Sequence, residues 1–171
     1  KMVVADGAGA GAAVTDVLDM TGGTGNVGLG SGSLGTAMTT GTDNVAVGEA
    51  ALDAFTTGSN NTAVGDNAAG ATTTGASNTA VGADALLLNT TASYNTAIAL
   101  DANTTGSDNT AIGDNALGAN TTAGTNTAIG SSAMAANTTG ADNVAVGNAA
   151  LDANTTAHSN TAIGTYSLSA N

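Results

Sequence analysis

Few side chains in this sequence could take part in a reaction. His158 is the only histidine, Ser159 follows it, and cysteine is absent. A hydroxyl or thiol nucleophile needs a neighbouring base that a third group orients, and no arranged pair of acids accompanies His158. The glycine-rich string Gly28-Leu29-Gly30 is not followed by a helical pattern, so a phosphate-binding loop is unsupported. We therefore expect His158 to be a solvated turn residue and the protein not to be an enzyme.

Six of the 13 acidic residues fall at two places around a recurring pentapeptide. Three precede its asparagine and three follow its glycine: Asp43, Asp108 and Asp142, then Glu49, Asp66 and Asp114. Glu49 and Asp66 share the same phase of adjacent repeats, where like charges repel and a calcium ion is the candidate bridge. The next residue at that phase is Ala83, so the ligand count is too small. We expect turn and solubility roles for these acids, and neither a metal site nor a cofactor.

Asparagine recurs at the head of the pentapeptide. These asparagines form one column: Asn44, Asn61, Asn78, Asn95, Asn109, Asn126, Asn143 and Asn160. Amide side chains stacked at strand spacing hydrogen-bond up and down a column, and buried polar groups are normally paired. We therefore expect this column to point inward as a structural ladder.

A second set of asparagines lies in N-T-T strings. Because side chains alternate along a strand, the asparagine and the second threonine of each string are expected to share one face. This candidate exposed polar face consists of Asn89, Thr91, Asn103, Thr105, Asn120, Thr122, Asn137, Thr139, Asn154 and Thr156. A solvated strand explains it, since threonine suits strands, and a flat ice-binding face is the alternative. The strings also match the glycosylation sequon, which is a weak signal.

An internal repeat positions these residues. The pentapeptide N-[TV]-A-[VI]-G recurs from Asn44 to Asn160, with a degraded copy at Asn26 and an N-T-A-I-A variant at Asn95. The spacing is 17 residues except for 18 after Asn26 and 14 after Asn95. A fixed period of this kind is typical of a solenoid, in which each unit buries its apolar side by stacking on its neighbours.

Two apolar columns run through the repeats. The first is the branched residue of the pentapeptide: Val47, Val64, Val81, Ile98, Ile112, Ile129, Val146 and Ile163. The second lies five residues further on: Leu52, Ala69, Leu86, Leu117, Met134, Leu151 and Leu168. Glycine between them permits a tight turn, and the glycines and threonines interrupt any helical stripe. We therefore predict an all-β parallel β-solenoid, or β-roll, of 17-residue coils with two short strands each, N-T-A-V and A-L-x-A-N-T-T.

The chain divides into two parts. Residues 1–25 are rich in glycine and alanine, and we expect an irregular N-terminal coil that serves as a cap or as a junction to a fibre domain. Residues 26–171 are expected to form a solenoid of nine repeats, the last of them truncated. A truncated coil has an unpaired edge, which favours stacking of another chain or domain. The 14-residue repeat is expected to have lost turn residues and kept its strand registers.

The charge balance disfavours several classes of partner. The 171-residue chain has a net charge of −12, with 13 acidic residues against one basic residue. Phosphate contacts need clustered lysine or arginine, so we expect no nucleic-acid binding and no anionic membrane surface. No run of about 18 apolar residues is present, so we expect no membrane insertion. Aromatic residues make up only 2% of the chain, and the sequence shows no aromatic platform for a sugar.

The repeats resemble those of a known protein family. The units N-T-A-I-G-S-S-A at residues 126–133 and N-T-A-V-G-D-N-A at residues 61–68 are similar to the head repeats of trimeric autotransporter adhesins, N-S-V-A-I-G-x-x-A. They are also similar to the N-T-A-x-G repeat arrays of phage tail-fibre and bacterial surface proteins. The resemblance covers about residues 26–171, although only the Asn95 unit has the length of the adhesin repeat. It implies a left-handed parallel β-roll, three chains side by side, and a role in attachment.

Together these observations favour an extracellular structural or adhesive fibre segment at a cell or virion surface. We expect it to self-associate, as a trimer or an end-to-end filament, with one apolar column as the seam. Its expected partners are copies of itself and a cell-surface receptor or glycan. Two alternatives stay open: an ice-binding β-solenoid with a flat threonine and asparagine face, and a carbohydrate-binding phage tail-fibre shaft.

Overall fold

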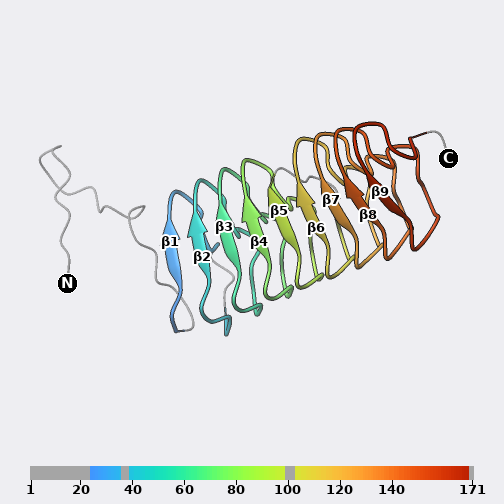
Figure 1. Ribbon diagram of the computed structural model, residues 1–171. Coiled ribbons are helices and arrows are strands. Elements are labelled where there is room, and N and C mark those ends of the chain that lie inside the picture. The colour runs from blue at the N-terminus through green and yellow to red at the C-terminus, as the bar shows by residue number, and fades with distance from the viewer. Residues whose placement is uncertain (1–23, 36–38, 99–102, 170–171) are drawn as a thin grey trace, which may run out of the picture.

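A single parallel β-sheet is wound into a solenoid in the computed structural model, which describes residues 24–35, 39–98 and 103–169 (Figure 1). Each strand pairs with the next one along the chain. The strands are β1 (Val27–Leu29), β2 (Val45–Val47), β3 (Thr62–Val64), β4 (Thr79–Val81), β5 (Thr96–Ile98), β6 (Thr110–Ile112), β7 (Thr127–Ile129), β8 (Val144–Val146) and β9 (Thr161–Ile163). The predicted all-β fold class is confirmed. All but two residues of the expected N-terminal coil, 1–25, lie outside the described residues.

Over these ranges the chain forms no helix, and therefore none that is long and apolar enough to cross a bilayer.

Successive coils stack in register. Thr62 of β3 lies beside Thr79 of β4, 17 residues further along the chain. Thr96 of β5 lies beside Thr110 of β6 in the same way, although only 14 residues separate them. The shortened repeat therefore keeps its strand register, as predicted, while residues 99–102 of that repeat lie outside the described ranges. Equivalent residues of successive coils form straight columns with a spacing of about 4.8 Å.

The solenoid is left-handed, as the family resemblance implies. In Figure 1 the strands lie toward the viewer and run upward, the chain returns behind them, and the coils advance from β1 to β9. Most connections between parallel strands of one sheet are right-handed, so this coil has the uncommon hand.

The segment predicted as a second strand, A-L-x-A-N-T-T, forms turns and bends instead. Ala50 and Leu52 have left-handed backbones with φ of 52° and 54°, and the same two positions are left-handed in most other coils. Hydrogen bonds between coils continue through this segment, because the Leu52 amide donates to the Ala68 carbonyl at 3.0 Å. Left-handed residues do not fit a strand. Within the described residues each coil therefore has one strand, and the return path is a stack of equivalent turns.

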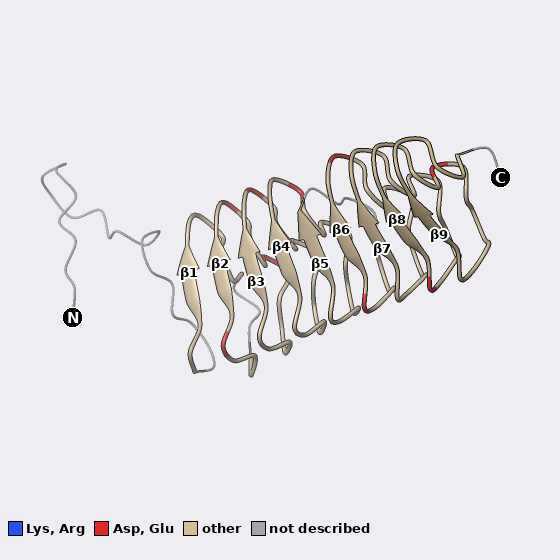
Figure 2. Cartoon of the chain, in the orientation of Figure 1, with Lys and Arg blue, Asp and Glu red and all other residues tan. Residues whose placement is uncertain are grey.

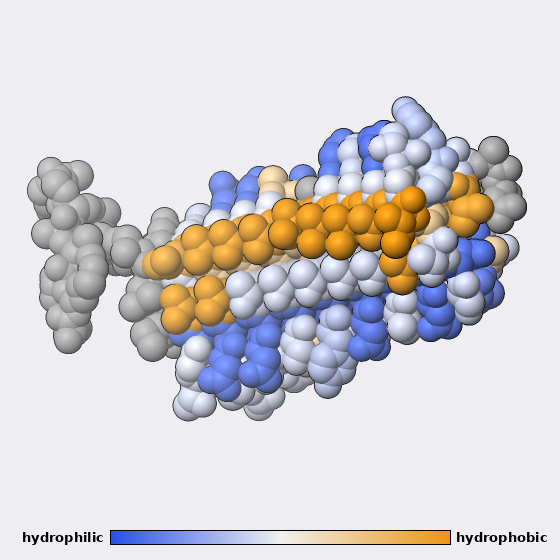
Figure 3. All heavy atoms as spheres, in the orientation of Figure 1, coloured by the Kyte–Doolittle hydropathy of each residue, from blue (hydrophilic) through white to orange (hydrophobic). Residues whose placement is uncertain are grey.

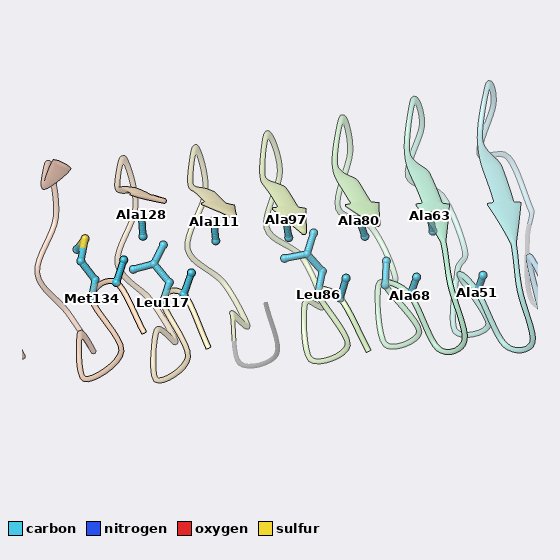
Figure 4. Packing of buried hydrophobic residues seen from close by; sticks show 14 of the residues in the cluster. Ala51, Ala63, Ala68, Ala80, Leu86, Ala97, Ala111, Leu117, Ala128 and Met134 are labelled. Carbon is cyan, nitrogen blue, oxygen red and sulfur yellow. The ribbon is translucent and has the colours of Figure 1, made fainter. Parts of the chain in front are cut away.

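The core is a layer of alanines packed against a column of larger side chains (Figure 4). The middle residue of each strand from β2 to β8 is an alanine without exposed surface: Ala46, Ala63, Ala80, Ala97, Ala111, Ala128 and Ala145. These alanines point toward the second apolar column, in which Leu86, Leu117 and Met134 are fully buried. Alanine lets the two walls approach closely, so the core is thin and densely packed.

A glycine column forms the corner that follows the strands. Gly48 has a φ of 137°, and a Cβ atom there would lie 2.3 Å from the carbonyl oxygen of Gly65 in the next coil. A Cβ atom at Gly65 would likewise lie 2.3 Å from the carbonyl oxygen of Gly82. Any side chain would clash with the neighbouring backbone and would also require an unfavourable φ. Glycine allows the described coils to stack at strand spacing at this corner, and Ala99 of the N-T-A-I-A repeat lies outside the described residues.

The leading asparagines form the inward ladder that the sequence predicted. Asn44 Oδ1 accepts hydrogen bonds from the backbone amide and the side-chain Nδ2 of Asn61, at 2.9 and 3.1 Å. Asn44 Nδ2 donates to the Gly58 carbonyl at 3.3 Å, which ties together the two ends of its own coil. Asn44 therefore closes its own coil and joins it to the next, and Asn26, Asn61, Asn78, Asn109, Asn126 and Asn143 make the same closing bond.

The ladder runs without a break from Asn26 to Asn160. It crosses the shortened repeat, where the Asn109 amide donates to Asn95 Oδ1 at 3.0 Å. From Asn26 to Asn143 its members are at most 2% exposed. These amides satisfy one another in the interior, as buried polar groups must.

Replacing Asn126 with alanine should destabilise the solenoid by about 2–4 kcal/mol, because the Asn143 amide and the Gly140 carbonyl lose their partners. Urea unfolding followed by circular dichroism measures the effect. The matched control is Asn148→Ala, which removes an exposed amide and should change stability by less than about 0.5 kcal/mol. Equal losses in the two variants would contradict the role of the ladder.

Replacing Ala50 with glycine should stabilise the protein by about 0.5–1 kcal/mol, because alanine is strained at a φ of 52° and glycine is not. Ala54, in the same coil, is half-buried like Ala50 but is not left-handed, so Ala54→Gly should destabilise by a similar amount. Thermal melting of both variants tests this difference in sign. A loss of stability in Ala50→Gly would show that the left-handed turn is unstrained.

Candidate interaction surfaces

The first apolar column lies on the outer surface of the sheet. Strand residues alternate, so the inward asparagine and the central alanine leave the branched residue pointing outward. Leu29, Val64 and Val81 are 36–37% exposed, and Ile98 is 42% exposed. Figure 3 shows the column as a continuous hydrophobic stripe along the solenoid. The sequence identified this column, and the structure assigns it to the surface while the second column forms the core.

A second outward column lies beside the stripe. It comprises the first residue of each strand: Val27, Val45, Thr62, Thr79, Thr96, Thr110, Thr127, Val144 and Thr161. We call the two columns together the strand face. It contains no charged side chain, and its two rows differ in character, one apolar throughout and the other mostly threonine.

Most of the charges lie along the turns that border the sheet, whereas Asp53 and Asp152 lie on the return path (Figure 2). The described part of the chain has nine acidic residues and neither lysine nor arginine. In these ranges no three residues among His, Cys, Asp and Glu lie close enough to hold a metal ion. Glu49 and Asp66 occupy equivalent turn positions of adjacent coils and are both exposed. The acids therefore surround the strand face with negative charge.

The prediction that the N-T-T asparagines lie on an exposed polar face is wrong. Asn89, Asn103, Asn120 and Asn137 have no exposed surface, and Asn154 is 7% exposed. The segment is not a strand, so strand alternation does not apply to it. The Asn120 Nδ2 group donates to the Ala123 carbonyl at 3.0 Å and to Asn103 Oδ1 at 2.9 Å. These asparagines form a second inward ladder, and as sequons they are inaccessible in the folded chain.

The second ladder is interrupted at the shortened repeat. No hydrogen bond joins Asn89 to Asn103 across the described residues, and Asn89 Oδ1 is buried without a partner there. On its other side, Asn89 Nδ2 donates to Thr72 Oγ1 of the preceding coil at 3.4 Å and to the Ala92 carbonyl at 3.2 Å. The deletion therefore interrupts this ladder and leaves the first one continuous.

The threonines of the N-T-T strings lie outside the core, and the second of each pair is exposed as predicted: Thr91, Thr105, Thr122, Thr139 and Thr156. The threonine pair also continues into coils that lack the asparagine, where Phe55 and Thr72 replace it, and these coils were not part of the predicted face. The sequence feature that indicates this longer column is that the threonine pair is kept in coils where another residue replaces the asparagine.

His158 takes part in the stacking of turns. Its Nδ1 accepts a hydrogen bond from the Ala141 amide of the preceding coil at 3.0 Å. Ser93 Oγ accepts from the Ala76 amide in the same way, also at 3.0 Å. The histidine thus occupies a position where serine does the same work, and makes the same hydrogen bond there.

Comparison with known proteins found no matching family model, no similar curated protein and no similar solved structure.

The two apolar columns should respond differently to truncation. Leu117→Ala removes a fully buried side chain and should cost about 2–5 kcal/mol. Ile129→Ala trims a side chain that is 36% exposed, so its cost in the monomer should stay below about 1 kcal/mol. Urea unfolding at a concentration where the chain is monomeric compares them. Similar costs would mean that the outward column supports the fold of the single chain.

Proposed function

We propose that this chain is a structural or adhesive segment of an extracellular fibre, and that it assembles side by side with copies of itself through the strand face. The observation that carries the proposal is the continuous outward column of valine, leucine and isoleucine side chains on β1 to β9, six of them exposed and Val47, Ile112 and Val146 half-buried. Contiguous apolar surface of this length on a single chain marks an interaction site.

The side chains of the hydrophobic stripe do not pack in the core of their own chain. Ala63 and Ala80 occupy the inward strand positions with no exposed surface, and Leu86 fills the space behind them. Aliphatic side chains in the outward row therefore contribute little inside the coil. Covering the remaining exposed apolar area would contribute about 25 cal/mol per Å², summed over every strand.

A second copy is the partner that the strand face fits best. Its columns repeat at a fixed spacing of about 4.8 Å, and only a partner with the same period can make equivalent contacts in every coil. Another copy of this solenoid has that period. The adhesin resemblance supports the same arrangement, since chains of that family associate side by side.

The negative charge of the chain makes this assembly depend on salt concentration. The strand face is uncharged, but acidic turns border it and no basic residue in the described ranges offsets them. Copies therefore repel one another at long range, and salt screens that repulsion over a Debye length of about 10 Å or less. An attachment role at a cell or virion surface is consistent with a rigid shaft of this kind, and the receptor or glycan would be bound elsewhere on the assembly.

The double variant Ile112→Lys/Ile129→Lys should remain folded and monomeric, because it places two charges in the centre of the apolar stripe. Light scattering with the native chain should give a multiple of 15.9 kDa, and the assembled fraction should rise with salt. Ala153→Lys, an exposed turn position outside the strand face, is the control and should assemble normally. A native chain that stays monomeric at high concentration and high salt would overturn the proposal.

A further inference from the structure

A pair of threonines recurs in eight coils without exception. The pairs are Thr39 and Thr40, Thr56 and Thr57, Thr73 and Thr74, Thr90 and Thr91, Thr104 and Thr105, Thr121 and Thr122, Thr138 and Thr139, and Thr155 and Thr156. They persist in the lengthened repeat and in the shortened one. The residue after the strand glycine, by contrast, changes freely among Glu49, Asp66, Ala83 and Ser131. We call the two columns of this pair the threonine face.

The first threonine of the pair has a structural role. Thr56 Oγ1 donates to the Thr73 carbonyl of the next coil at 2.9 Å, and Thr104 Oγ1 donates to the Thr121 carbonyl at 2.8 Å. Six such bonds run along the column. They fix the side-chain rotamer, and they leave the methyl group as the remaining surface of this residue.

Nothing in the fold requires the second threonine. It is exposed in all eight coils, and its hydroxyl makes no hydrogen bond to any described residue. In four coils its backbone amide bonds to the next coil, as Thr57 does to the Thr73 carbonyl at 3.2 Å, but any residue except proline can supply that bond. It lies in a bend, so the preference of threonine for strands does not explain it. Eight identical exposed residues without a structural reason indicate a surface that binds something.

We propose that the threonine face binds ice. It presents hydroxyl and methyl groups in two straight rows with a spacing of about 4.8 Å, and neither row contains a charge. Free hydroxyls can bind water, and hydrogen bonds mediated by water are almost as favourable as direct ones. Hydrogen bonds along the stack already hold the first-row side chains in one rotamer. These side chains therefore lose little conformational entropy when a ligand binds. A crystalline lattice of water is a ligand that repeats as regularly as this surface does.

A polysaccharide fits the same surface less well. Sugar rings are usually held by aromatic side chains. Phe55 is fully buried, whereas Tyr94 and Tyr166 belong to other turn positions and form no row. The inference does not rest on the proposed assembly, because the threonine face and the strand face are separate surfaces of the coil.

Nanolitre osmometry of the full chain tests the inference. The native protein should show a gap between its melting and freezing temperatures and should shape growing ice crystals. Thr105→Lys/Thr122→Lys should lose both effects, because lysine interrupts the rows with hydrated charge. Thr105→Tyr/Thr122→Tyr, which adds bulk without charge, should lose them too. Circular dichroism and melting curves confirm that each variant is folded.

The matched control is Ile112→Lys/Ile129→Lys on the strand face, which should keep its ice activity even where it no longer assembles. A native chain without thermal hysteresis at millimolar concentration would overturn the inference and leave the assembly proposal standing. Threonine-face variants that keep full activity would also overturn it. So would binding to a glycan array that the same variants abolish, if ice growth is unaffected.

Discussion

The inward asparagine ladder is the constraint on which the rest of each coil depends. Strands of three residues make few hydrogen bonds, and the Asn44 side chain adds bonds to its own coil and to the next. With asparagine facing inward, strand alternation sends the next residue outward, the alanine inward and the branched residue outward. The apolar stripe on the surface therefore follows from the polar ladder in the interior.

The period and the fold class could be read from the sequence because each repeat carries the same pentapeptide. The return path could not, because its conformation depends on left-handed residues such as Ala50, Leu52 and Leu86. Alanine and leucine have no local preference for that region. Their backbone is set by stacking on neighbouring coils, so strand alternation placed the N-T-T asparagines on the wrong side.

The shortened repeat shows which side of the coil is the more demanding. The first ladder crosses it with an ordinary hydrogen bond of 3.0 Å between the Asn109 amide and Asn95 Oδ1. The second ladder is interrupted there, and Asn89 Oδ1 is left buried without a partner among the described residues. Strand pairing thus continues at full register while the return path absorbs the change. Variation in repeat length is easier to accommodate opposite the sheet than within it.

The first ladder also has a direction. In every step the later coil contributes the amide and the earlier coil contributes the Oδ1 acceptor, as between Asn61 and Asn44. A chain leaves the ribosome with its N-terminal end first, so each completed coil already displays the acceptor that the emerging coil requires. Synthesis and folding can therefore advance together, one turn at a time, with every new turn laid on the template left by the one before it.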